Sequence, residues 1–158
     1  MENLYVNTAI TIWENQVIRA ENLFQKFTNE EWLSEICPGK NRVIYIIGHL
    51  IASADHISPI IGTGTAAYPE LLDIFIKNPD KAISDLPPVE QLKKLWHKTN
   101  SRISVELKTL TNEDWLQKHK TVSIEDFAKE PHRNKLSILL NRTNHLTYHI
   151  GQLTLLKK

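Results

Sequence analysis

Two histidines near the C-terminus, His145 and His149, have the type and spacing that most directly suggest chemistry. On a helix, residues four apart lie about 6 Å apart along the axis and about 40° apart around it. Two such imidazoles can reach one metal ion, because a tetrahedral zinc ion needs ligand nitrogens only about 3.3 Å apart. Leu146 follows the first histidine, so the glutamate of the His-Glu-x-x-His metalloprotease motif is missing and a zinc protease is disfavoured.

A third histidine, His49, lies in an apolar segment that we predict to be helical. The helical repeat places it at the edge of that segment's apolar face, and it places His145 and His149 at the edges of theirs. Helical bundles build metal sites from such facing positions, and three protein ligands with an open fourth position are typical of a catalytic site. Spacing alone favours the plainer alternative, in which all three are surface or hydrogen-bonded histidines.

The other four histidines, His56, His97, His119 and His132, are interpreted as non-ligands. His56 shares the helix face of His49, but about 10 Å along the axis separates them, too far for one ion. His119 and His132 lie in polar connectors, where we expect them to be solvated.

Two residues beside His149 suggest supporting roles. Gln152 follows it by one turn and could orient a ligand ring through a hydrogen bond; an exposed glutamine is the alternative. Gly151 is expected to let the helix approach a neighbour closely. No Asp or Glu is placed clearly enough to be named as a general base, so catalytic groups are left unassigned.

Apolar residues recur three and four apart in four long segments. They predict helices over residues 3–27, 42–60, 88–110 and 134–156. A shorter helix is predicted over 70–77, and 122–131 has the composition of a polar connector. Glycines and prolines in 62–88 predict a long crossover between the second and third long helices. The predicted fold is therefore all-α, a four-helix bundle forming a single domain over residues 1–158.

Composition limits the classes of partner. The 158 residues are 41% hydrophobic and 23% charged with a net charge of +1, and no basic run exceeds two residues, which argues against nucleic acid. No uninterrupted apolar run approaches the roughly 20 residues of a membrane span, and the N-terminus does not resemble a signal peptide. Cys37 is alone, so no internal disulfide can form. We expect a cytoplasmic protein without membrane or nucleic-acid partners.

Two motifs together resemble the DinB/YfiT-like family of metal-binding four-helix bundles. They are Gly48-His49-Leu50 on an early helix and His145-Leu146-Thr147-Tyr148-His149-Ile150-Gly151-Gln152-Leu153 on the last. The resemblance covers nearly the whole chain, and the His-x-x-x-His-x-Gly-Gln ending is its most specific part. It implies that His49, His145 and His149 bind a divalent ion, most often zinc or nickel.

The resemblance also implies a metal-dependent enzyme acting on a small-molecule substrate. The reaction would be transfer that uses a low-molecular-weight thiol, or hydrolysis, and the protein would be a homodimer. The alternative is a non-catalytic metal-binding or dimerising interaction module. One feature departs from the family pattern: a Trp-Ser pair usually begins the second helix, whereas Lys40-Asn41-Arg42 stands there in this chain. Asn41 could still cap that helix, but the substrate preference is left open.

Overall fold

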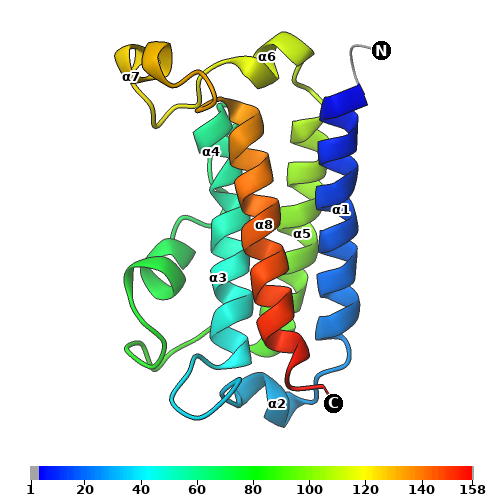
Figure 1. The fold of residues 1–158 in the computed structure, drawn as a ribbon. Coiled ribbons are helices and arrows are strands. Elements are labelled where there is room, and N and C mark those ends of the chain that lie inside the picture. The colour runs from blue at the N-terminus through cyan, green and yellow to red at the C-terminus, as the bar shows by residue number, and fades with distance from the viewer. Residues whose placement is uncertain (1–3, 158) are drawn as a thin grey trace.

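The computed structural model describes residues 4–157, and every regular element within them is helical. Four long helices lie side by side (Figure 1). They are α1 (Leu4–Phe24), α3 (Val43–Asp55), α5 (Val89–Leu107) and α8 (Lys135–Thr154). The shorter elements are α2 (Asn29–Leu33), α4 (Ile57–Ile61), the π-helix η1 (Asp73–Lys77), α6 (Asn112–Leu116) and α7 (Ile124–Lys129). The prediction of an all-α fold is confirmed, while the predicted start at Asn3 lies outside the described residues.

The long helices enclose one apolar core. α8 packs on α1 and α3, and α5 packs extensively on α3 but more sparsely on α1. Trp13, Ile46 and Ile103, from three of the long helices, are almost completely buried, and so are Trp32 of α2 and Trp115 of α6. Each buried side chain of this size contributes roughly 1.5–3 kcal/mol. The short helices α2 and α6 thus close opposite ends of the core (Figure 1).

The predicted second helix is divided in two. α3 ends at Asp55 and α4 begins at Ile57. Pro59 accounts for the division, because proline has no N–H to bond the carbonyl four residues earlier, that of Asp55, and its ring crowds that carbonyl. The expectation of one continuous helix over residues 42–60 was therefore wrong in this detail, although both pieces bury their apolar side chains.

Asn41 does not cap α3. The N-terminal cap is Arg42, which makes no side-chain capping bond. Its backbone N–H and its guanidinium instead bind the carboxylate of Asp80, each at 2.7 Å. This pair fixes the start of α3 to the crossover between α4 and α5.

The crossover is held at its other end by Asp55, which is almost fully buried. Its carboxylate accepts the N–H groups of Ala67 and Tyr68 at 3.0 and 2.9 Å and pairs with Arg102 of α5 at 2.5 Å. Between the two anchors, η1 packs against α3. The connector expected over 122–131 also differs from prediction, because it contains α7, whose first turn is capped by Ser123.

The segment Val43–Ile61 is long and apolar enough to cross a membrane, judged by length and composition alone. Its mean hydropathy is 1.3, and 78% of it is buried inside the protein. Core helices of soluble proteins have the same character, so the segment is weak evidence about location.

Candidate metal centre

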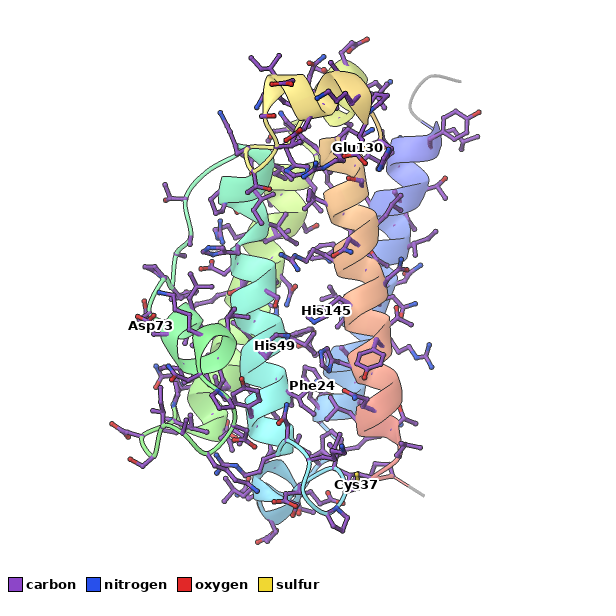
Figure 2. The ribbon with its side chains drawn as sticks, turned by 60° about the vertical axis from the view of Figure 1, so that its left-hand side comes forward. Phe24, Cys37, His49, Asp73, Glu130 and His145 are labelled. Carbon is purple, nitrogen blue, oxygen red and sulfur yellow. The ribbon has the colours of Figure 1, made fainter. Side chains whose placement is uncertain are left out.

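The three predicted ligands lie together in the structure. His49 is on α3, whereas His145 and His149 occupy successive turns of α8. Figure 2 shows the side chains of His49 and His145 pointing toward one another across the space between α3 and α8. All three are partly buried, so they belong to neither the dry core nor the open surface.

Their Nε2 atoms converge on one point. The Nε2 of His145 lies 3.0 Å from that of His49 and 3.1 Å from that of His149. The nearest ligand atoms of all three residues lie within 4.8 Å of one another. The two separations that involve His145 are close to the roughly 3.3 Å between nitrogens bound to one tetrahedral ion.

In two of the three rings, the opposite nitrogen, Nδ1, has a hydrogen-bond partner. The Nδ1 of His49 donates to the carbonyl oxygen of Phe75 at 2.9 Å, because a carbonyl can only accept. The Nδ1 of His149 donates to the Oε1 of Gln152 at 2.8 Å. The Nε2 of Gln152 in turn donates to the hydroxyl of Tyr148 at 2.9 Å. Gln152 therefore makes the hydrogen bond to the His149 ring that the sequence suggested, and the role of that ring as a metal ligand stays a prediction.

With these tautomers, the three converging Nε2 atoms carry too few protons for both of their close contacts to be hydrogen bonds. Both His49 and His149 direct a lone pair at the Nε2 of His145. A neutral His145 has at most one N–H there, so at least one of the two close contacts joins two lone pairs. A cation at the centre would remove that repulsion. The residues therefore fit a metal ion better than they fit a set of ordinary hydrogen bonds.

Burial is the main reason that the pKa values of all three histidines lie below the ordinary value. For His145, burial and the nearby charges of His149, His49 and Arg142 lower the pKa to about 4. All three imidazoles are therefore neutral near pH 7. Neutral imidazole is the form that binds a metal ion.

The centre is open on one side to a cavity of about 150 Å³. Its lining residues are Asn41, Tyr45, Ile46, His49, Ile76 and His149. Within the described part of the chain, no further His, Cys, Asp or Glu joins the three ligands. A small molecule could therefore reach an ion held there through this cavity. None of these residue types would supply a fourth protein ligand.

The support that η1 gives to the site was not predicted from the sequence. Phe75 reaches His49 because residue 48 is glycine: a Cβ on Gly48 would overlap the Phe75 ring. The Gly48-His49 pair therefore allows η1 to pack closely and lets the Phe75 carbonyl hold the histidine. The glycine before His49 was the available signal, but Phe75, which bonds His49, lies 26 residues further along the chain.

Gly151 has a different environment from the one expected. It is exposed, and a Cβ there would meet nothing within 4 Å. The prediction that it permits close helix packing was wrong.

None of the other four histidines is near the centre. His56 is the C-terminal cap of α3, and His97 and His132 are exposed. His119, expected to be solvated, is instead 6% exposed. Its connector folds back onto the protein because the Lys120 N–H donates to the carbonyl of Ile60 at 2.8 Å.

The sequence matches no known family model and no curated protein. The DinB/YfiT-like resemblance therefore stays a prediction from its motif residues. The geometry of the three histidines is the principal basis for any functional proposal.

Proposed function

We propose that this protein is a divalent-metal-dependent enzyme of the DinB-like four-helix-bundle type, in which His49, His145 and His149 bind one ion. The observation that carries the proposal is the convergence of three Nε2 atoms from rings of which two are held through Nδ1. An imidazole fixed in this way by a second hydrogen bond is the usual arrangement of a metal-ligating histidine.

The metal would supply the reactive chemistry. A zinc or nickel ion with three imidazole ligands and a free position allows water or a thiol to act as a nucleophile near neutral pH. The protein's own residues would orient the histidines and admit the substrate. Phe75 and Gln152 hold two of the histidine rings, and the side chains of Tyr45 and Ile76 form walls of the approach. We propose transfer that uses a low-molecular-weight thiol, or hydrolysis, on a small-molecule substrate.

The described part of the centre contains no carboxylate that could act as a general base. Among the described residues no Asp or Glu joins the three histidines, and none contributes to the pKa values of the three rings. A metal ion lowers the pKa of bound water as well as that of a bound thiol, so thiol transfer and hydrolysis are both open to this site without a separate general base. A purely structural metal would call for a fourth protein ligand, so we place the non-catalytic alternative second.

The experiment combines metal analysis with an activity screen. The purified protein, the variant His149→Ala and the control His132→Ala would be analysed for bound metal. Each would then be screened for thiol transfer and ester hydrolysis with and without a chelator. We expect about one ion per chain and chelator-sensitive activity in the parent and control only. Full metal content in His149→Ala would contradict the ligand assignment, and activity that survives chelation would contradict the metal-dependent reaction.

We also propose a cytoplasmic homodimer that binds neither nucleic acid nor membrane. The net charge of +1 argues against nucleic acid, the single, exposed and unpaired Cys37 fits a reducing compartment, and the dimer is what the family resemblance implies. Light scattering on the purified chain tests the oligomeric part: a mass of two chains supports it, and a mass of one chain contradicts it.

A further inference from the structure

A row of three hydrogen bonds fastens the η1 segment, which we define as residues 73–80, to one side of α3. The residues that bind it lie three and four positions apart, at and after the start of the helix, and are Arg42, Tyr45 and His49. Their partners are, in the same order, the carboxylate of Asp80 and the carbonyl oxygens of Asn78 and Phe75, at 2.7, 2.6 and 2.9 Å. The row therefore ends at a candidate metal ligand.

The η1 segment also forms one wall of the approach to the centre. Ile76, which belongs to the segment, lines the cavity of about 150 Å³ together with Tyr45 and His49. The ring of Tyr45 lies at 15° to that of His49, with 6.5 Å between the centroids. The position of the segment thus affects both the orientation of His49 and the width of the approach.

Two acceptors compete for the single N–H of a neutral His49 ring. Its Nδ1 lies 2.9 Å from the carbonyl oxygen of Phe75, and its Nε2 lies 3.0 Å from the Nε2 of His145. A neutral imidazole carries its proton on only one of the two nitrogens. The tautomer with the proton on Nε2 could donate to His145, but it would turn the lone pair of Nδ1 toward the Phe75 carbonyl. That tautomer breaks the last bond of the row.

His49 loses this choice when its Nε2 binds a metal ion. Coordination uses the lone pair of Nε2, so the proton of the neutral ring must be on Nδ1, where it faces Phe75. The bonds of Arg42 and Tyr45 do not depend on the tautomer of His49. The end of the segment beside the approach is therefore the part that responds to the ion.

We propose that His49 fastens the η1 segment to α3 when it binds a metal ion, so that metal binding and closure of this wall of the approach are coupled. The inference rests on the proposed function, because it concerns the same ion and the same approach. Arg42, Tyr45 and Phe75 are positioning residues in this account. The coupling is reciprocal, since contacts that favour the closed segment also favour the bound ion.

Hydrogen–deuterium exchange of the backbone amides, with a chelator and with saturating zinc, tests the coupling. Well below the Tm, such amides exchange through local openings, so a peptide that covers residues 73–80 reports the η1 segment. We expect zinc to slow its exchange by about fivefold or more, the lower end of typical couplings between sites. A peptide from α7, at one end of the bundle (Figure 1), should be unaffected and serves as the internal control.

Two variants test the contacts that carry the coupling. Tyr45→Phe removes the bond to Asn78 alone, so residues 73–80 should exchange about two- to tenfold faster in both conditions, as for the loss of one hydrogen bond. The slowing by zinc should persist in this variant. Tyr5→Phe, which alters an exposed tyrosine on α1, is the matched control and should behave as the parent does. Gly48→Ala displaces the Phe75 ring, so at saturating zinc it should hold one ion but lose most of the slowing.

The outcomes separate this inference from the metal proposal. If the parent binds no zinc, the proposed function and the inference both fail. If the parent binds one ion per chain but zinc slows residues 73–80 no more than it slows α7, the coupling is overturned and the metal site stands. Should Gly48→Ala fail to fold, Tyr45→Phe still decides the role of the row. Exchange in Tyr45→Phe equal to that in Tyr5→Phe would show that these bonds do not hold the segment.

Discussion

At the residue scale, the proposed metal site depends on the hydrogen bonds behind the three histidines as well as on the histidines themselves. Phe75 and Gln152 each engage the Nδ1 of one histidine and thereby leave its Nε2 free to bind a cation. Such supporting hydrogen bonds fix the tautomer and the orientation of the ring that they hold. The four-residue spacing of His145 and His149 was readable from the sequence because it is a local property of one helix.

Gln152→Ala tests the supporting bond directly. Loss of the amide oxygen frees the ring of His149 to rotate and to change tautomer, so we expect metal affinity to fall by about 10–100-fold. Saturating metal should still give full stoichiometry, because no ligand is lost. Isothermal titration calorimetry would measure the change, with the exposed Gln91→Ala as control. Equal affinities in the two variants would show that Gln152 does not support the site.

The lowered histidine pKa values predict how stability depends on pH without metal. The folded chain holds His49, His145 and His149 neutral, whereas the unfolded chain protonates them near pH 6.5. The unfolded state therefore binds more protons as the pH falls from about 6.5 toward 4, and the free energy of unfolding decreases in that window.

Urea unfolding at pH 7.5, 6 and 5 in the presence of a chelator would measure this dependence. His145→Leu should weaken it, because the residue with the pKa of about 4 is removed. His132→Leu should leave it unchanged, since His132 is exposed. A stability that is flat between pH 7.5 and 5 in the parent would contradict the account of a buried, neutral cluster.

At the element scale, the packing of η1 on α3 positions His49. A Cβ on Gly48 would overlap the Phe75 ring, so Gly48→Ala must displace η1 and with it the Phe75 carbonyl. We expect this variant to lose about 1–3 kcal/mol of unfolding free energy, the usual effect of overpacking, and to bind metal more weakly.

Gly151→Ala is the matched control, because a Cβ there meets nothing within 4 Å on an exposed helix. It should be neutral or stabilising by up to about 1 kcal/mol, the difference in helix propensity between the two residues. Both variants would be compared by thermal unfolding and by metal titration. A Gly48→Ala protein as stable as Gly151→Ala would show that η1 is not packed as described.

The elements also show which parts of the fold the sequence could reveal. Periodic apolar residues predicted the four long helices, because their burial depends on one helix face at a time. The division of the predicted second helix at Pro59 follows from the missing N–H of proline, a local effect that the continuous apolar pattern obscured. The burial of His119 and the contact of Phe75 with His49 depend on distant segments folding back, which periodicity does not encode.

At the scale of the whole molecule, the core forms without the metal. Large apolar side chains from all four long helices are buried independently of the centre. We therefore expect the chelated protein to remain folded and the ion to add stability by binding the native state. At a free metal concentration 100 times the Kd, this linkage contributes about 2.7 kcal/mol. For a domain of this size, it raises the Tm by roughly 5–11 °C.

Calorimetric melts with chelator, with zinc and with nickel would measure that rise. The rise should disappear in His49→Ala, which lacks a ligand, and persist in His97→Ala, whose histidine is exposed on α5. If the chelated protein were unfolded at room temperature, the metal would be structural and the catalytic proposal would lose its main support.

The most direct test of the account is a crystal structure of the protein grown with zinc, with anomalous data collected on both sides of the zinc absorption edge. We predict one anomalous peak about 2.0–2.1 Å from the Nε2 atoms of His49, His145 and His149, with the Nδ1 bonds to Phe75 and Gln152 preserved. Zinc-edge data with no peak between these three nitrogens, or with the zinc bound only elsewhere, would contradict the central claim.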